Sequence, residues 1–227
     1  MAFKSKNTIN AWWNKDTLSF TLYEGLQNPS AQVMQKEDVS PAAVQEAPQE
    51  PSSQEMPLAD LSLLFANSDF ELGDLTHWTQ AGNAFDFQPT KGDNPTARGR
   101  KTQPSQHRGE FWIGTFEKYQ GTAKERPGMR QGDRPTGTLT SVLFEITADK
   151  ISFLIGGGRN ADKETVSLMV DGQVVHSATG TGNETLKQQV WDVSAYMGRT
   201  AQIVITDAHP GGWGHINADD FRYVGIQ

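Results

Sequence analysis

The chain has 227 residues, which is enough for one good-sized domain with a tail or for two small domains. Its 22 glycines and 11 prolines, with hydrophobic residues at only 36%, favour a loop-rich β protein over a helical bundle. The net charge of −7 argues against nucleic acid as a partner, because phosphate backbones are held mainly by Lys and Arg.

Cysteine is absent, so the fold has no disulfide and no thiolate metal site and must rest on its core or on an oxygen-ligated ion. No apolar run of signal-peptide length follows the first ten residues, and no apolar stretch of membrane-spanning length occurs. From the sequence as written we expect neither an export signal nor a membrane span.

Three regions follow one another along the chain. Residues 1–26 form a short aromatic-containing segment, in which Leu18–Leu22 alternates like one short strand and Trp12 and Trp13 receive no functional role. Residues 27–57 are rich in Pro, Gln and Glu without Gly or aromatic residues, which is typical of a solvated linker. We therefore expect a mostly disordered N-terminal extension and one ordered domain at 58–227.

Within 58–227 short strands are separated by Gly, Pro, Asp and Asn. Alternating apolar residues predict the strands 142–146, 151–155, 166–170 and 201–205, with Val142, Phe144 and Ile146 on one core face. Asp171-Gly172 predicts a tight hairpin, because both turn positions tolerate positive φ. No helical pattern lies between the strands, so the fold class is all-β, an antiparallel β-sandwich of the jelly-roll type.

Several stretches, in the same order and at similar spacing over about 160 residues, resemble the family-66 carbohydrate-binding modules. They are Asn67–Trp78 (NSDFELGDLTHW), Phe111–Glu117 (FWIGTFE), Gly132–Ser141 (GDRPTGTLTS), Ile151–Gly158 (ISFLIGGG), Trp191–Gly198 (WDVSAYMG) and Gly211–Asp219 (GGWGHINAD). The chain departs from the family pattern at 90–109 and 122–131, where it carries longer basic and polar loops.

The resemblance implies a galactose-binding-like sandwich, of the kind attached to family-32 glycoside hydrolases, that binds terminal fructose units of levan-type fructans without catalysis. It implies a polysaccharide or oligosaccharide partner, an attached or associated hydrolase, and an extracellular or cell-surface location. Residues 1–60 are too short and too polar to hold a catalytic propeller. The chain is then a free-standing lectin-like protein, a piece of a larger enzyme or an adaptor.

A sugar must be held by side chains that both donate and accept, because each hydroxyl left unpaired on burial costs about 1–3 kcal/mol. Charged planar groups at strand ends and an aromatic residue between glycines fit this role. The predicted ligand-binding residues are Glu117, Asp133, Arg134, Arg159, Asp207, Trp213 and His215. No catalytic residue is predicted. Trp78 and Trp112 are expected in the core.

The acids Glu71 and Asp219 are the predicted metal ligands. In a sandwich whose first and last strands lie together, these carboxylates could share a structural Ca²⁺, an ion that prefers several oxygen ligands. The alternative is that they are strand-end acids in salt bridges. His209 and His215 lack zinc-site spacing.

Other interpretations stay open for the chain. The basic residues Arg98, Arg100, Lys101 and Arg108 are interpreted as a solvated surface insertion. A structural or adhesion sandwich that mediates protein assembly is the main functional alternative to sugar binding. A small hydrolase with paired carboxylates would need a deep cleft, which no sequence feature requires.

Overall fold

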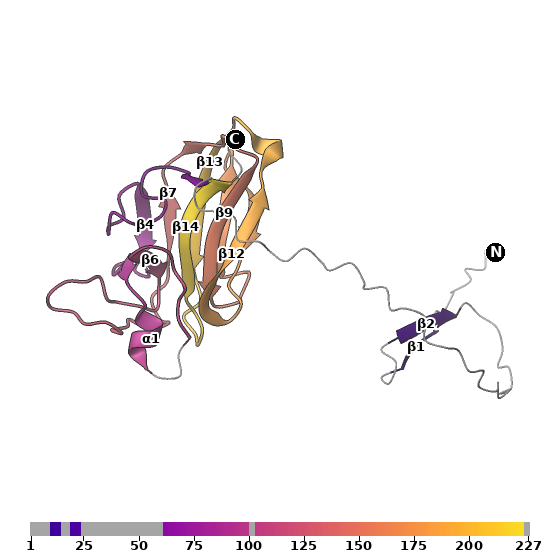
Figure 1. Cartoon of the computed structure of the whole chain (residues 1–227), viewed down its shortest axis with the longest axis horizontal. Helices are drawn as coiled ribbons and strands as arrows, with labels where there is room; N and C mark the ends of the chain where they lie inside the picture. Colours follow the sequence, from indigo (N-terminus) through magenta and orange to yellow (C-terminus); the bar gives the residue numbers. More distant parts are fainter. Residues whose placement is uncertain (1–9, 15–18, 24–60, 100–102, 225–227) are drawn as a thin grey trace, which may run out of the picture. The chain divides into compact units, whose positions relative to one another are not determined.

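The computed structural model describes residues 10–14, 19–23, 61–99 and 103–224 (Figure 1). The chain divides into two units, Met1–Ser52 and Ser53–Gln227. In the first unit β1 (Asn10–Asn14) pairs with β2 (Ser19–Tyr23), so the predicted strand at 18–22 is present and Trp12 and Trp13 lie on a partner strand that the sequence did not predict. The predicted linker at 27–57 lies outside the described residues. No helix in the described ranges is long and apolar enough to cross a membrane.

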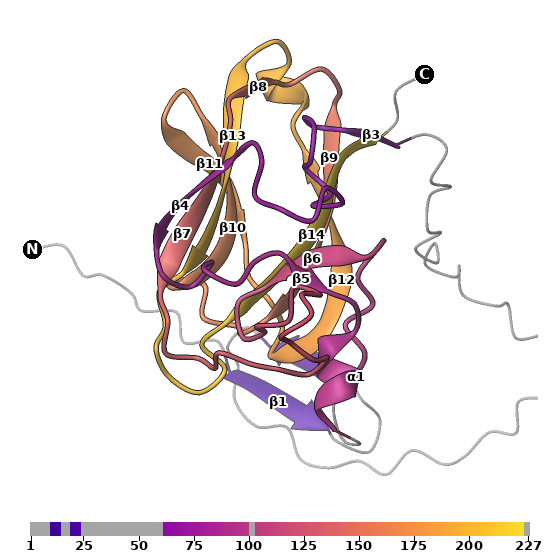
Figure 2. The ribbon, with the colours of Figure 1, turned by 90° about the vertical axis from the view of Figure 1, so that its left-hand side faces the viewer.

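The second unit is built on two antiparallel sheets, seen as separate layers in Figure 2. One sheet has the order β11-β10-β13-β7-β4, with β8 also paired to β13. Its strands are β4 (Trp78–Gly82), β7 (Gly137–Ser141), β8 (Phe144–Glu145), β10 (Glu164–Val170), β11 (Gln173–Ala178) and β13 (Thr200–Asp207). The predicted all-β sandwich is confirmed.

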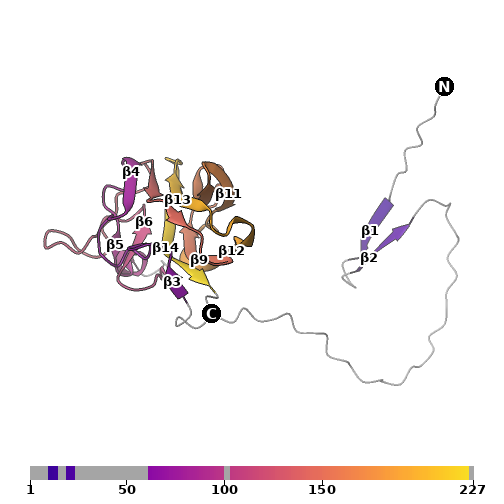
Figure 3. The same ribbon diagram turned by 90° about the horizontal axis from the view of Figure 1, so that it is seen from above.

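The other sheet has the order β12-β9-β14-β6-β5, and β3 pairs with β14, as Figure 3 shows. Its strands are β3 (Leu61–Leu63), β5 (Thr90–Lys91), β6 (Phe111–Gly114), β9 (Lys150–Gly157), β12 (Asn183–Asp192) and β14 (Ile216–Val224). The expectation that the first and last strands of the sandwich lie together is therefore confirmed. Among the described residues of this unit, the helical elements are α1 (Asn94–Arg98) and one 3₁₀ turn at Ser194–Tyr196.

The main core lies between the two sheets and follows the period-two alternation of the strands. On β13, Ala201, Ile203 and Ile205 are buried while the residues between them are partly exposed. Phe221 of β14 stacks on Phe153 of β9 with ring centroids 5.2 Å apart. Both rings are fully buried, so this pair is part of the main core.

Of two local predictions, the hairpin is confirmed and the core placement of Val142 is wrong. The hairpin at Asp171-Gly172 joins β10 to β11 with φ of 49° and 76°, as the turn residues predict. The placement of Val142 on the core face was wrong, because Val142 is 39% exposed whereas Phe144 is buried. The sheet breaks between Ser141 and Phe144, and this break resets the alternation.

A second apolar cluster, Trp112, Leu154 and Leu186, lies on the opposite face of β9 from the main core. Residues 103–107, which follow α1 in the chain, lie against it. His107 stacks on Trp112 with ring centroids 5.6 Å apart, and the Leu186 amide donates to the carbonyl of Ser105. Trp112 and also Trp78 of the main core are buried, as expected.

Phe221→Ala should lower the free energy of unfolding by about 3–5 kcal/mol, because it removes a fully buried ring and leaves a cavity between the sheets. Urea denaturation of the full chain measures this change. Leu143→Ala, at a side chain that is 66% exposed, is the control and should change stability by about 0.5 kcal/mol or less. Equal losses for the two variants would contradict the described core.

Candidate functional site

Chemically reactive side chains gather at one end of the sandwich. Antiparallel pairing brings the end of β9 and the starts of β12 and β14 together, since Gly157 lies opposite both Asn183 and Ile216. In the other sheet the start of β10 meets the end of β13, where Glu164 lies opposite Asp207. Strand ends from both layers therefore meet at this end, where irregular loops can carry polar groups on a rigid scaffold.

The first component is a polar cluster, defined as Arg98, Glu117, Asp133, Glu184 and His215. The Arg98 guanidinium lies between two carboxylates, with its Nη2 2.9 Å from Glu117 Oε1 and 2.7 Å from Glu184 Oε1. His215 Nδ1 is 2.8 Å from Asp133 Oδ1, and its Nε2 is 3.6 Å from Glu184 Oε2, an ion-pair distance and not a hydrogen bond. The cluster is a continuous chain of alternating charges.

Burial and these contacts shift the pKa values in opposite directions. Burial raises the pKa of Glu117 to about 7, against the lowering effect of Arg98. Burial alone would raise the pKa of Glu184, but His215 and Arg98 outweigh it and hold the value at about 2. Burial alone would lower the pKa of His215, but Asp133 and Glu184 raise it to about 9. At neutral pH Glu184 is thus ionised and His215 protonated, while Glu117 is close to its titration midpoint.

Several hydrogen-bonding atoms of this region are buried without a hydrogen-bond partner. Both carboxyl oxygens of Glu117 have none, although Oε1 is within ion-pair distance of Arg98. Arg98 Nε, His215 Nε2 and, on β14, Asn217 Oδ1 are also buried and without a hydrogen-bond partner. An unsatisfied buried polar atom costs about 1–3 kcal/mol, so their concentration at one place calls for a functional explanation.

The second component is a pocket of about 620 Å³, here called the end pocket. It is lined by Arg159, Asn160, Glu164, Thr181, Gly182, His209, Gly212 and Trp213. Trp213 is 48% exposed and stacks on His215, with ring centroids 5.4 Å apart and an angle of 26° between the rings. The indole therefore forms a boundary between the end pocket and the polar cluster.

The loop that presents Trp213 is tightly constrained. Trp213 has φ of 61°, a backbone conformation that only glycine adopts readily, and a Cβ on Gly214 would meet the His209 carbonyl oxygen at 1.7 Å. His209 Nδ1 lies 2.6 Å from the buried Glu164 carboxylate, which also accepts from the Asn160 amide. Glu164 and His209 thus fix the loop on which the exposed ring is carried.

The structure brings together most of the predicted ligand-binding residues. Glu117, Asp133 and His215 belong to the polar cluster, Trp213 borders it, and Arg159 lines the end pocket. The Asp207 carboxyl is buried at the end of β13 and accepts from Thr115 Oγ1 at 2.6 Å, and burial raises its pKa to about 6. Arg134 is exposed next to Asp133 in the chain and is not among the residues that line the end pocket.

Sequence reasoning missed Arg98, Glu184, Glu164 and His209 as members of the site. The interpretation of Arg98 and Arg108 as solvated was wrong, because the Arg98 side chain is only 10% exposed between two carboxylates and Arg108 pairs with Asp220 at 2.6 Å. The other two basic residues, Arg100 and Lys101, lie outside the described residues. The one available signal for Arg98 was Asp93-Asn94-Pro95, a helix start, which places Arg98 at the last residue of α1.

The predicted metal ligands Glu71 and Asp219 both hold the segment 108–111. The Glu71 carboxylate accepts from the amides of Glu110 and Phe111, and Asp219 Oδ2 accepts from the Arg108 amide at 2.7 Å. Asp219 is fully buried and its Oδ1 has no hydrogen-bond partner. No group of three or more His, Cys, Asp or Glu suited to a metal ion occurs in the described part of the chain. Further ligands of an ion would therefore be carbonyl oxygens or water.

Comparison with known proteins gives partial matches. No family model matches the chain. A protein of Aspergillus rugulosus named "Putative glycosyl hydrolase ecdE" is 47% identical over 92 residues, which is 40% of this chain and 13% of that protein. The match thus spans a small part of that relative's length.

Solved structures resemble this chain at low identity. The carbohydrate-binding module TmCBM61, solved in complex with β-1,4-galactotriose, has 18% identity and a TM-score of 0.45, covering 72% of this chain and 99% of the module. The K3 adhesin domain of Lys-gingipain from Porphyromonas gingivalis has 13% identity and a TM-score of 0.39, covering 69% and 97%. A family-35 carbohydrate-binding module of Clostridium thermocellum has 15% identity and a TM-score of 0.25, covering 40% and 71%.

Glu117 should make the stability of the fold depend on pH. Its carboxyl has a native pKa of about 7 and an ordinary value of 4.5, so the unfolded chain releases this proton at lower pH than the folded chain. The stabilisation of the fold by the protonated Glu117 carboxyl is fully present below pH 4.5 and is lost as the pH rises through 7. Glu117→Gln has no such proton. The free energy of unfolding of this variant minus that of the wild type should therefore increase by up to about 3 kcal/mol between about pH 5 and about pH 8.

Urea denaturation at a series of pH values measures this difference. Glu110→Gln is the control, because the Glu110 side chain is 66% exposed, and its curve should run parallel to the wild type. Parallel curves for Glu117→Gln and the wild type would show that the Glu117 carboxyl titrates normally.

Proposed function

We propose that this protein is a non-catalytic carbohydrate-binding protein whose ligand binds at the end of the sandwich that carries the polar cluster and Trp213. The observation that supports this most directly is the set of buried, unpartnered hydrogen-bonding atoms on Arg98, Glu117 and His215 beside an exposed indole. A site made of charged planar groups and one aromatic face matches the chemistry of a sugar.

The chemistry of the cluster suits neutral hydroxyl groups. Ionised carboxylates accept the O–H hydrogens of a sugar, while the Arg98 guanidinium donates to its oxygens. The indole of Trp213 offers an apolar surface to the C–H face of the ring. Because each of these groups is held by a neighbour in the cluster, little side-chain ordering remains to oppose binding.

Binding without catalysis is the function that this geometry favours. Glu117 and Glu184 both contact the same guanidinium, and the Glu117 side chain is only 1% exposed. A glycosidase needs two carboxyl groups on either side of a bound sugar, with room for the scissile bond between them. In this protein Arg98 lies where that bond would have to be.

The ligand we propose, terminal fructose units of levan-type fructans or a related glycan, is supported by the resemblance of the sequence to family-66 modules. The identity of 47% over 92 residues with a protein named as a glycosyl hydrolase supports an accessory role beside such an enzyme. A polysaccharide ligand of this kind implies an extracellular or cell-surface location. The affinity of a single small site should be weak, with a dissociation constant on the order of 10 µM to 1 mM.

Trp213→Ala should weaken binding about tenfold or more while the domain stays folded, because it removes a half-exposed aromatic ring that lies outside the apolar core. Isothermal titration calorimetry of the full chain against levan, inulin, fructose, β-1,4-galactan and an unrelated glucan measures the effect. Met197→Ala is the matched control, since Met197 is 49% exposed, is not in the lining of the end pocket and should leave binding unchanged. Absence of binding to the whole panel by the wild type would instead favour the assembly function.

We further propose a structural Ca²⁺ held by Glu71 and Asp219. The unpartnered, buried Asp219 Oδ1 supports this, because an oxygen-preferring cation would satisfy it. The ion would fasten the segment 108–111 to β14 and supply no catalytic chemistry.

Calcium should therefore raise the melting temperature of chelated protein, with a stabilisation of about 2.7 kcal/mol when the ion is at 100 times its dissociation constant. Asp219→Asn should abolish that response, whereas Asp86→Asn, at an exposed residue, should keep it. Differential scanning calorimetry with and without chelator is the measurement. A wild-type melting temperature that neither chelator nor calcium changes would exclude the ion.

A further inference from the structure

We propose that the end pocket is a second sugar subsite, with Arg159 as its main contact, so that the protein binds at least two consecutive units of a glycan chain. This inference rests on the proposed carbohydrate-binding function and extends it. The first unit lies against the polar cluster and Trp213, and the next unit lies in the end pocket.

The size of the end pocket is the first argument. Its volume of about 620 Å³ is within the range of roughly 300–1,000 Å³ of pockets that hold drug-sized ligands. One hexose is much smaller than such a ligand, whereas a disaccharide or trisaccharide is comparable to it. A site for one terminal sugar would not need this space.

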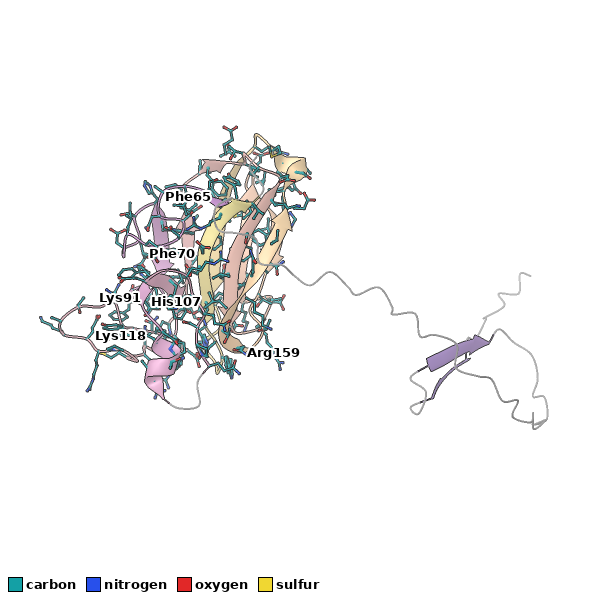
Figure 4. All side chains as sticks on the ribbon, viewed as in Figure 1. Phe65, Phe70, Lys91, His107, Lys118 and Arg159 are labelled. Atoms are coloured by element: carbon teal, nitrogen blue, oxygen red, sulfur yellow. The ribbon has the colours of Figure 1, made fainter. Side chains whose placement is uncertain are left out.

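The second argument is the set of hydrogen-bonding groups that the end pocket leaves free. Within the described part of the chain the Arg159 guanidinium makes no ion pair and no hydrogen bond, and Arg159 is exposed at the pocket. Figure 4 labels Arg159 at the end of the sandwich where α1 also lies. Five N–H donors in a fixed plane are thus available to a ligand.

The acid of the same pocket, by contrast, is already engaged. The Glu164 carboxylate is held by His209 and by the Asn160 amide, and Asn160 Oδ1 accepts from the Asp162 amide. What remains free in the end pocket is therefore mainly donors: the Arg159 guanidinium, the side-chain Nδ2 of Asn160 and the hydroxyl of Thr181. These groups suit ring, glycosidic and hydroxyl oxygens.

The two subsites have complementary chemistry and share one wall. The polar cluster presents the partly exposed carboxylates of Asp133 and Glu184, which accept hydrogen bonds, whereas the end pocket presents donors. Trp213 lines the end pocket and stacks on His215 of the cluster. A glycan that passes over the indole can therefore place the hydroxyl hydrogens of one unit against the cluster and the oxygens of the next unit against Arg159.

The test is the dependence of affinity on chain length, measured by calorimetry on the full chain with fructose, levanbiose and levantriose, and in parallel with galactose, β-1,4-galactobiose and β-1,4-galactotriose. In the series that binds, the wild type should bind the disaccharide about tenfold or more tightly than the monosaccharide. Arg159→Ala should reduce that ratio to about twofold or less while leaving the monosaccharide affinity within about twofold of wild type. Arg159→Lys should give an intermediate ratio, because it keeps the charge but loses the planar fork.

Arg126→Ala is the control, since it removes an exposed arginine that does not line the end pocket and should keep the wild-type ratio. Equal affinities of the wild type for one, two and three units would overturn the second subsite and leave the proposed function intact. A loss of monosaccharide binding by Arg159→Ala would also overturn it, by placing Arg159 on the first unit. Absence of binding of both series to the wild type would refute the proposed function itself, and the second subsite with it.

Discussion

The end of the sandwich depends on one guanidinium, that of Arg98, whose side chain is only 10% exposed. Arg98 lies within ion-pair distance of Glu117 and Glu184, and it packs over the ring of Phe116 with its Cζ 4.5 Å from the ring centroid. Without this charge, two carboxylates would share a poorly hydrated space and repel each other, at a cost of several kcal/mol. The five-residue helix α1 and the segment that follows it are therefore as much a part of the site as the strands.

β14 connects this site to the rest of the domain. It begins directly after His215, carries Asn217 beside Glu184, contributes Phe221 to the main core and includes Asp219 opposite β9. The register of β14 with β9 shifts between Asp219 and Arg222, so the strand changes which face each side chain meets part-way along. One strand thus carries polar groups toward the site at its start and apolar groups toward the core near its end.

Much of the fold could be predicted from the sequence because the signals are local. Val166, Leu168 and Val170 alternate into the core, and Asp171-Gly172 turns the chain, as period-two patterning and turn chemistry require. Val142 was misplaced because the break after Ser141 leaves no trace in the hydrophobic pattern. Glu117, Asp133 and His215 were predicted as hydrogen-bonding side chains at strand ends and in glycine-rich loops, and the structure places them in one cluster.

The partners of those residues could not be predicted because they depend on non-local geometry. Glu184 lies where β12 departs from its register with β9, between Asn183 and Lys187, and that irregularity is specified by the loop at Pro104 and Ser105 that takes over the pairing. Arg98 reaches the cluster from the end of α1, and His107, farther along the chain, stacks on Trp112. Arg98 and Glu184 are 86 positions apart in the chain, and sequence patterns carry little information about contacts at such a separation.

The energetics of the cluster favour a role in recognition over a role in stability. A buried ion pair rarely stabilises a fold more than apolar residues of the same size, because desolvation offsets the attraction between the charges. The unpartnered atoms of Glu117, Arg98 and His215 increase this cost further. A fold that needed only stability would fill this end with apolar side chains, as it fills the space around Phe221. Polar groups held by their neighbours yet short of partners discriminate strongly, because a ligand that lacks the matching hydroxyl leaves them unpaired. On the proposed sugar-binding function, the polar groups at the sandwich end serve selectivity for the ligand, and the apolar core between the two sheets supplies the stability that offsets their cost.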